Sequence, residues 1–192
     1  IGEIWGLQTI GIAKSEEEMQ AHLSSLPKGG QEAIGSKWSA GDIMYRDLNG
    51  DGKISKGAST LDDHGDLKVI GNSTPRYFFG IDLNADWKGF DVRLFFQGVM
   101  KRDYWGKDNF CGYLFGARGD KDMWHARGLV EHQDYFRAQA IGIDGHELPA
   151  NLDAYYPRPV FKEGAKNQET QSRYLQDASY IRLKNFQLGY TL

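Results

Sequence analysis

Apolar and polar residues alternate most regularly between residues 75 and 99. In RYFFGIDLNADW every second side chain is apolar, and these side chains share one face: Phe79, Ile81, Leu83, Ala85 and Trp87. After Lys88-Gly89 the alternation resumes in FDVRLFFQGV, again with one apolar face: Phe90, Val92, Leu94 and Phe96. Because a period of two residues is that of a β-strand and two residues suffice for a tight turn, the pattern predicts a β-hairpin over 75–99.

The other face of this hairpin is polar along its length: Asp82, Asn84, Asp86, Asp91 and Arg93. In a soluble sandwich the apolar face would be core and the polar face would meet water. In an outer-membrane barrel the apolar face would meet lipid and the polar face a wet lumen or plug. The alternation alone favours the commoner soluble sheet, whereas strands of about ten residues with Trp87 at one end suit a barrel with an aromatic girdle.

The end of the chain has a third strand pattern, predicted over 176–192. In YIRLKNFQLGYTL, Ile181 and Leu183 share a face, the phase slips at Lys184-Asn185, and the apolar alternation then continues from Phe186. One extra residue that shifts the phase predicts a β-bulge. Because the chain stops on a strand pattern, we expect it to be a piece of a longer protein.

Between these strands the pattern is irregular, except for one short helix. SEEEMQAHLSS predicts a surface helix over 15–26, with Ser15 as the N-cap, Glu18 completing a capping box and Pro27 beyond its end. The remainder of 1–74 reads as loop and strand. The segment 100–175 reads as one long loop, and loops of such length are usually functional.

Composition supports a mainly β fold and removes several function classes. The chain has 24 Gly, ten Tyr and ten Phe in 192 residues, and its net charge of −3 gives no argument for nucleic acid. The single cysteine, Cys111, excludes an internal disulfide framework. The first residues lack the pattern of a signal peptide, and no run of about 18 apolar residues is present. The five histidines form no catalytic or zinc motif, so we expect no enzyme.

A calcium-type loop precedes the hairpin. In DLNGDGKIS, the side chains of Asp47, Asn49 and Asp51 alternate, the Lys53 carbonyl would follow as the fourth ligand, and Gly52 permits the sharp turn. Ca²⁺ prefers six to eight oxygen ligands, which alternate residues on a turning loop can direct to one point. The pattern predicts a structural Ca²⁺ site, with an ion-free Asp/Asn/Gly turn as the alternative.

The acid that should close this loop is displaced, because Ala58 occupies its usual position twelve residues from the start. Three acids follow in STLDDHGDLKVIG: Asp62, Asp63 and Asp66. If residues 56–65 make an excursion, any of the three could fold back onto the loop, which spans 47–66.

Several segments together resemble the C-terminal half of SusC/RagA-type TonB-dependent outer-membrane transporters, the nutrient importers of Bacteroidetes. The resemblance is carried by GDIMYRDLNGDGKIS, VIGNSTPRYFFGIDLNADWKGFDVRLFFQGV, YYPRPVF and ASYIRLKNFQLGYTL, in that order. It implies a fragment of a large β-barrel of about 22 strands around a plug. It also implies the outer membrane of a Gram-negative bacterium, a SusD-like surface lipoprotein as partner, energy through TonB, and oligosaccharide or peptide cargo.

The resemblance implies a place for each segment. The apolar face of the hairpin becomes lipid-facing, Lys88-Gly89 becomes a periplasmic turn, and 1–74 and 100–175 become extracellular. In the family an acid stands just before a segment like VIG, which makes Asp66 the counterpart of the closing ligand. Here the intervening segment is about eight residues longer, so Asp62 and Asp63 remain competitors.

A soluble, calcium-stabilised β-module that binds carbohydrate is the alternative function. Its support is the loop together with six aromatic side chains that could stack on sugar rings: Tyr104, Trp105, Trp124, Tyr135, Tyr155 and Tyr156. These same aromatics could serve an importer, or they could pack the loop against itself. Solubility of the whole protein separates the two functions.

Overall fold

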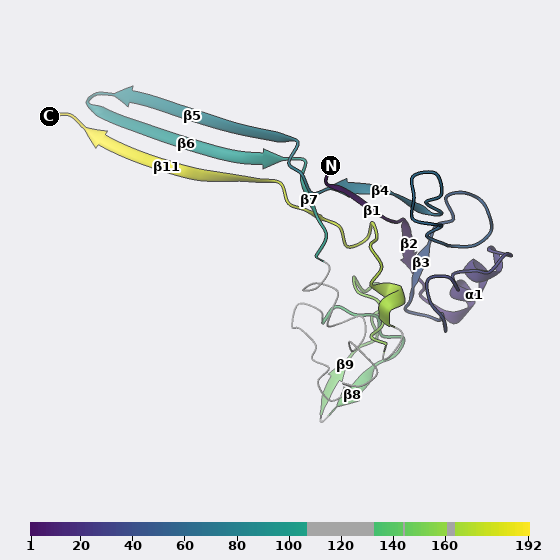
Figure 1. Cartoon of the computed structure of the whole chain (residues 1–192). Coiled ribbons are helices and arrows are strands. Elements are labelled where there is room, and N and C mark those ends of the chain that lie inside the picture. The colour runs from purple at the N-terminus through teal and green to yellow at the C-terminus, as the bar shows by residue number, and fades with distance from the viewer. Residues whose placement is uncertain (107–132, 144, 161–163) are drawn as a thin grey trace, which may run out of the picture. The chain divides into compact units, whose positions relative to one another are not determined.

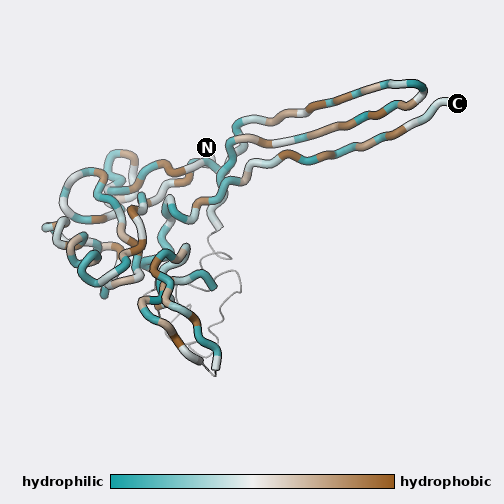
Figure 2. Tube along the Cα trace, turned by 180° about the vertical axis from the view of Figure 1, so that it is seen from behind, coloured by the Kyte–Doolittle hydropathy of each residue, from teal (hydrophilic) through white to brown (hydrophobic). Residues whose placement is uncertain are grey.

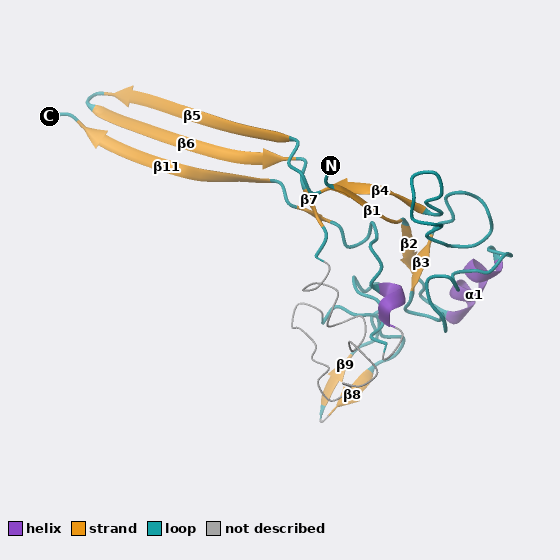
Figure 3. Cartoon of the chain, viewed as in Figure 1, coloured by secondary structure: helices purple, strands orange, loops and turns teal. Residues whose placement is uncertain are grey.

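The computed structural model describes residues 1–106, 133–143, 145–160 and 164–192. The chain divides into two compact units (Figure 1). The first unit comprises Ile1–Ile4, Gly71–Trp105 and Leu175–Leu192, and the second comprises Trp5–Ile70 and Gly106–Tyr174. As the sequence predicts, the described part is mainly antiparallel β-structure with one α-helix (Figure 3).

Three long strands form the sheet of the first unit. They are β5 (Tyr77–Trp87), β6 (Phe90–Met100) and β11 (Tyr180–Tyr190), in the order β11-β6-β5 and antiparallel throughout. Lys88 and Gly89 join β5 to β6 with positive φ angles of 48° and 86°, as a two-residue turn between twisted strands requires. The predicted hairpin is confirmed. Because β11 pairs with β6, the long segment between them connects neighbouring strands.

The strand register gives this sheet one face without any charged residue. Directly paired residues of antiparallel strands share a face, and Leu94 pairs with Leu83 on one side and with Phe186 on the other. Figure 2 shows the resulting alternation of hydrophobic and hydrophilic positions along the three strands. We call this surface the apolar face: Tyr77, Phe79, Ile81, Leu83, Ala85, Trp87, Phe90, Val92, Leu94, Phe96, Gly98, Met100, Ile181, Leu183, Phe186, Leu188 and Tyr190.

The predicted β-bulge lies in β11. Leu183 pairs with Phe96 and Asn185 pairs with Phe95, so Lys184 has no partner in the ladder. The extra residue keeps Ile181 and Phe186 on the same face, although they are five positions apart. The bulge therefore makes the apolar face continuous across β11.

Short strand pairs make up the rest of the β-structure. In the first unit β7 (Asp103–Tyr104) pairs with β10 (Gln176–Asp177). The others pair as follows: β1 (Glu3–Leu7) with β4 (Leu67–Asn72), β2 (Thr9–Ile12) with β3 (Ile43–Tyr45), and β8 (Ile141–Ile143) with β9 (His146–Leu148). The described residues of 100–175 thus contain short strands and a 3₁₀ turn, Gly164–Asn167, within an otherwise irregular segment.

The helix α1 (Glu16–Ser24) lies in the second unit, and its N-cap is Ser15 as predicted. The Ser15 hydroxyl accepts a hydrogen bond from the Glu18 N–H at 3.2 Å. The reciprocal half of the capping box differs, because the Glu18 carboxylate accepts from the N–H of Lys14 at 2.6 Å. Within the described ranges, no helix has both the length and the apolar character to span a membrane.

The core of the second unit combines apolar and polar side chains. Leu7, Met19, Ile43, Tyr45 and Ile54 are buried in it. Polar and charged side chains are buried as well: Gln31, Asp42, Asp66, Lys166, Asn167 and Gln171. Buried polar groups are stable only when they are hydrogen-bonded. The hydrogen bonds of these six side chains therefore hold the loops of this unit in place.

Candidate functional site

The apolar face is exposed at its centre as well as at its ends. Leu83 is 51% exposed, Phe186 60% and Leu188 62%. A contiguous exposed apolar surface larger than a few hundred Å² marks a contact with protein or lipid. The exposure of these side chains therefore makes the apolar face a candidate contact surface, because water alone is a poor solvent for it.

Aromatic residues stand at one end of this face. Trp87 pairs with Phe90, and the Phe90 and Tyr190 rings lie 4.6 Å apart. At the other end Tyr77 pairs with Met100. The 11 residues of β5 span about 34 Å at ~3.4 Å per residue, or about 24 Å along the normal of a membrane if tilted by ~45°. That height matches the apolar band of ~25 Å in outer-membrane barrels.

The opposite face of the sheet is polar and carries an ion pair. Arg93 Nε lies 3.1 Å from Asp82 Oδ1, and Arg93 Nη2 lies 2.6 Å from Asp82 Oδ2. This bidentate pair links β5 and β6 across the ladder. The sheet thus separates an uncharged side from a charged side, as the alternation in the sequence predicts.

The three candidate acids lie in different surroundings. Asp66 is fully buried, and its carboxylate accepts hydrogen bonds from the N–H groups of Leu48 at 2.7 Å and Ser55 at 2.8 Å. Asp62 is exposed, and Asp63 accepts within the excursion, from the N–H of Ala58 at 3.1 Å. The structure therefore brings the Asp66 carboxylate to the loop, and its role as the closing ligand of a metal stays a prediction.

The other candidate ligands turn their oxygens toward amides of the loop itself. Asp47 accepts from Gly50 and Gly52 at 2.6 and 2.8 Å, Asn49 from Asp51 at 2.9 Å, and Asp51 from Lys53 at 3.1 Å. Among the described residues, no group of three or more Asp, Glu, His or Cys side chains is gathered for a metal. The donor set suits Ca²⁺ chemically, but the carboxylates of Asp47 and Asp51 would have to turn toward a shared point, so the calcium site stays a prediction.

The loop pairs on its far side with the turn that follows α1. Ile54 is fully buried, and its N–H donates to the Gly30 carbonyl at 2.7 Å in an isolated parallel bridge between Gly30 and Lys53. The Lys28 N–H likewise donates to the Gly52 carbonyl at 2.8 Å. The turn after α1 thus holds the loop through backbone hydrogen bonds.

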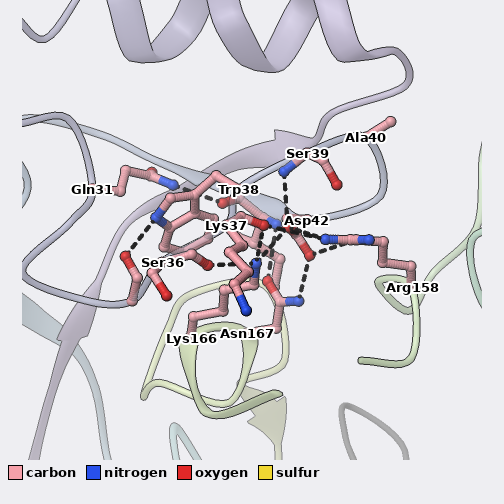
Figure 4. A network of polar contacts seen from close by, with 12 residues as sticks. Gln31, Ser36, Lys37, Trp38, Ser39, Ala40, Asp42, Arg158, Lys166 and Asn167 are labelled. Carbon is pink, nitrogen blue, oxygen red and sulfur yellow. Dashed lines mark hydrogen bonds and ion pairs between the residues drawn. The ribbon is translucent and has the colours of Figure 1, made fainter. Parts of the chain in front are cut away.

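A buried ionic network joins two distant parts of the second unit (Figure 4). Arg158 binds the Asp42 carboxylate with two hydrogen bonds of 3.0 Å, while Lys166 and Asn167 approach it at 2.7 and 3.0 Å. Burial alone would raise the pKa of Asp42, but hydrogen bonds from Arg158, Lys166 and Asn167 outweigh this effect and hold the pKa below its ordinary value.

Lys166 is the buried cation of this network, with an exposed fraction of 1%. Its ammonium donates to Asp42 and to the carbonyls of Ser36 and Lys37 at 3.0 and 2.8 Å, which uses all three of its N–H bonds. It also lies 4.8 Å from the centre of the Trp38 ring. Lys37 adopts a positive φ of 54°, which brings its carbonyl to the ammonium.

The six aromatic candidates lie in different environments. Tyr104 is 53% exposed and Tyr155 is 37% exposed, whereas Tyr156 is 5% exposed and stacks on Tyr174. The Arg137 guanidinium lies 4.6 Å from the Tyr135 ring. Trp105 is partly buried, and Trp124 lies outside the described residues. The structure brings three members of this set together, because the Tyr155 and Tyr156 rings lie 4.8 Å apart and Tyr135 forms a backbone bridge with Tyr156.

Sequence reasoning missed the network and one aromatic residue, Trp5. Asp42 and Lys166 are 124 positions apart, so no local pattern connects them. A signal was present nonetheless, because Asp42 lies in GDIMY and Arg158 in YYPRPVF, two of the segments that carry the family resemblance. Trp5 lies next to His64, with ring centres 5.6 Å apart, and sequence alone gives no reason to pair them.

Three curated proteins, all TonB-dependent receptors, are similar to the chain. The chain is 27% identical over 195 residues to TonB-dependent receptor P3 of Formosa agariphila, covering 100% of this chain and 15% of that protein. It is 26% identical over 196 residues to TonB-dependent receptor P26 of the same organism, covering 97% and 15%. With TonB-dependent receptor P39, also from Formosa agariphila, it shares 26% over 151 residues, covering 79% and 12%. No model of a protein family matches the chain.

These relatives define the chain as a mainly β segment that is similar, over its whole length, to TonB-dependent receptors. The resemblance predicted from the sequence is confirmed at that level. The chain spans about 15% of the length of the relatives P3 and P26.

Proposed function

We propose that this chain supplies barrel wall and external loops to a SusC/RagA-type TonB-dependent importer in the outer membrane. The observation that carries the proposal is the apolar face, which runs uncharged across three paired strands and has aromatic residues at one end. A face that is half exposed at Leu83 and Leu188 requires an apolar environment, and lipid around a barrel is such an environment.

The unpaired edges of the sheet support the same conclusion. In the described part, β5 and β11 each pair with β6 on one side and have no long strand on the other. Within the hydrocarbon region every backbone N–H and C=O must be paired, so an open sheet edge cannot face lipid. The proposal therefore places further strands of the same barrel beside β5 and β11.

The lengths of the connections between strands support one direction of the sheet across the membrane. Bacterial barrels have short periplasmic turns and longer external loops. The turn at Lys88-Gly89 has two residues, whereas the connection from β6 to β11 runs from residue 101 to residue 179. The second unit would then lie outside the cell, where it could meet a SusD-like lipoprotein and oligosaccharide or peptide cargo. TonB would act from the periplasmic side.

The loop 47–66 would bind Ca²⁺ in a structural role. Support comes from the placement of Asp66, which the excursion brings back onto the loop that begins at Asp47. The ligands would come from Asp47, Asn49, Asp51, the Lys53 carbonyl and Asp66. A bound dication would neutralise the carboxylates that the loop concentrates, and thereby hold the loop in one conformation.

Cell fractionation of the full-length protein tests the main proposal. We expect it in the outer membrane, with the mobility change on heating that marks a folded barrel. Recovery from the soluble periplasm or cytoplasm would refute the importer, and the alternative of a soluble carbohydrate-binding module would then need another surface to cover the apolar face. Growth of a deletion strain on oligosaccharides or on peptides as sole carbon source identifies the cargo class.

A further inference from the structure

A cavity of about 310 Å³ lies in the second unit, and its lining includes none of the described aromatic residues that the sequence singled out. Its lining comes from two places in the chain: Trp5 of β1, and Ser59, Thr60, Leu61, His64 and Leu67. A pocket of ~300 Å³ with apolar walls and a few polar groups has the size and character of a small-molecule site.

The wall of the cavity is a small closed loop. Gly57 and Gly65 meet at its neck, where a Cβ on Gly57 would come within 2.6 Å of the Gly65 nitrogen. Within the loop, Thr60 donates to the Asp63 carbonyl at 3.1 Å and the Asp63 N–H donates to the Thr60 hydroxyl at 3.1 Å. These hydrogen bonds shape residues 57–65 before any ligand arrives, which lowers the entropic cost of binding.

Ser59 adds a second sign of a built site. It has a positive φ of 56°, a conformation that costs a non-glycine residue energy and that often accompanies ligand-binding loops. The hydroxyl-bearing residues Ser59 and Thr60 follow one another along the wall, and Leu61, which is 81% exposed, forms the lip. The residue with the strained backbone, Ser59, is thus one of those that line the cavity.

The chemistry of the lining is mixed in a way that suits a sugar. Trp5 and Leu67 offer apolar surface, and His64 lies beside Trp5 with a ring-centre distance of 5.6 Å. His64 Nδ1 lies 3.2 Å from the Gly65 carbonyl, so the tautomer that donates this hydrogen bond leaves Nε2 as an acceptor. A pyranose ring presents C–H groups on its faces and hydroxyls at its rim, and so matches both kinds of group.

We propose that Trp5, His64 and the 57–65 loop bind one monosaccharide unit. The ring face of Trp5 would contact the C–H face of the sugar, and His64 Nε2 would accept from a sugar hydroxyl, with Ser59 as a further polar partner. The site adds a glycan-binding step to the proposed importer function. It rests on that function only for the role of the site, which would be capture of a glycan outside the membrane.

Saturation-transfer NMR on the full-length protein in detergent tests this site. The probes are methyl β-D-glucopyranoside, methyl β-D-galactopyranoside and N-acetylglucosamine. We expect at least one of them to bind, Trp5→Ala to weaken that binding by about tenfold, and Trp5→Phe to retain most of it, because an aromatic face remains. His64→Ala should weaken binding by roughly fivefold. Phe78→Ala, which removes an exposed aromatic side chain from β5, is the matched control and should change nothing.

Three results would overturn the proposal: no binding of any probe, equal binding by Trp5→Ala, or selective binding of N-acetyl-leucinamide, which would indicate a peptide side chain. Unchanged heat-dependent mobility of each variant shows that it has folded. Excision of residues 58–64 joins Gly57 to Gly65 and should abolish glycoside binding by removing the wall. Outer-membrane localisation without glycoside binding would refute this site alone, and glycoside binding by a soluble protein would refute the importer alone.

Discussion

Asp66 and Ser55 hold each other through two hydrogen bonds of 2.8 Å: the Asp66 N–H donates to the Ser55 carbonyl, and the Ser55 N–H donates to the Asp66 carboxylate. The segment between them contains the whole 57–65 loop. The contact therefore joins the two ends of that segment, so residues 57–65 protrude from the loop without separating Ser55 from Asp66.

The first prediction concerns this contact. Asp66→Ala should lower the free energy of unfolding by about 1–3 kcal/mol, because it leaves the N–H groups of Leu48 and Ser55 without their acceptor. Thermal unfolding of the full-length protein in detergent measures the change. Asp62→Ala, at an exposed acid of the same loop, is the control and should have an effect close to zero. Equal effects of the two variants would contradict the assignment of Asp66.

Calcium removal gives the second prediction. A chelator should lower the melting temperature of the wild-type protein and leave Asp47→Ala and Asp66→Ala unchanged, since each variant lacks a ligand. Re-addition of Ca²⁺ should restore the wild type alone. A wild-type melting temperature that does not respond to the chelator would show that the loop is an ion-free Asp/Asn/Gly turn.

The third prediction uses two neighbouring residues of β6 that face opposite sides. Leu94→Lys places a charge in the middle of the apolar face and should cost about 2–4 kcal/mol of stability in the bilayer. Phe95→Lys places the same charge on the polar face and should cost far less. Folding into lipid vesicles, followed by mobility on unheated gels, compares them. Equal tolerance of both variants would argue against lipid contact.

The buried ion pair gives the fourth prediction. Asp42→Asn should destabilise the protein by about 3–5 kcal/mol, because it leaves the Lys166 ammonium buried without its counter-charge. A double-mutant cycle with Lys166→Met should show coupling between the two positions, which are in direct contact. Additive single effects would mean that Arg158, and not Lys166, is the principal partner of Asp42.

The fifth prediction is the acid dependence of this network. The folded-state pKa of Asp42 lies below its ordinary value of 3.8, so the unfolded chain takes up the proton first as the pH falls. The stabilisation is fully present above about pH 4 and is lost as the pH falls through the lower, folded-state pKa. As the pH is lowered from about 7 to about 2, the free energy of unfolding should therefore decrease more steeply for the wild type than for Asp42→Asn. Parallel curves would exclude Asp42 as the group responsible.

Local periodicity explains which parts of the fold could be predicted. The β5–β6 hairpin, the bulge in β11 and the cap of α1 each depend on residues within a few positions of one another, so their patterns are visible in the sequence. The phase slip at Lys184-Asn185 even located the bulge. What the pattern could not provide was the partner of β11, since 79 residues separate Met100 from Tyr180 in the chain.

The site was less predictable because it depends on contacts between distant segments. Loop chemistry left Asp62, Asp63 and Asp66 as alternatives, and only the family resemblance favoured Asp66, which the structure brings to the loop. Asp42 with Lys166, and Trp5 with His64, become visible only when the chain has folded. Tyr156 shows the converse. Its aromatic side chain suggested contact with a ligand, whereas its burial indicates a packing role.

The bulge at Lys184 also makes β11 one residue longer than its ladder requires. Deletion of Lys184 would leave Leu183 and Phe186 on the apolar face with regular alternation between them, whereas deletion of Gln187 would disturb the phase of the residues beyond it. Tolerance to a change in length is thus concentrated at a single position of the strand. In a scan that deletes one residue at a time, the variant that lacks Lys184 should still assemble, whereas variants that lack a neighbouring residue of β11 should not.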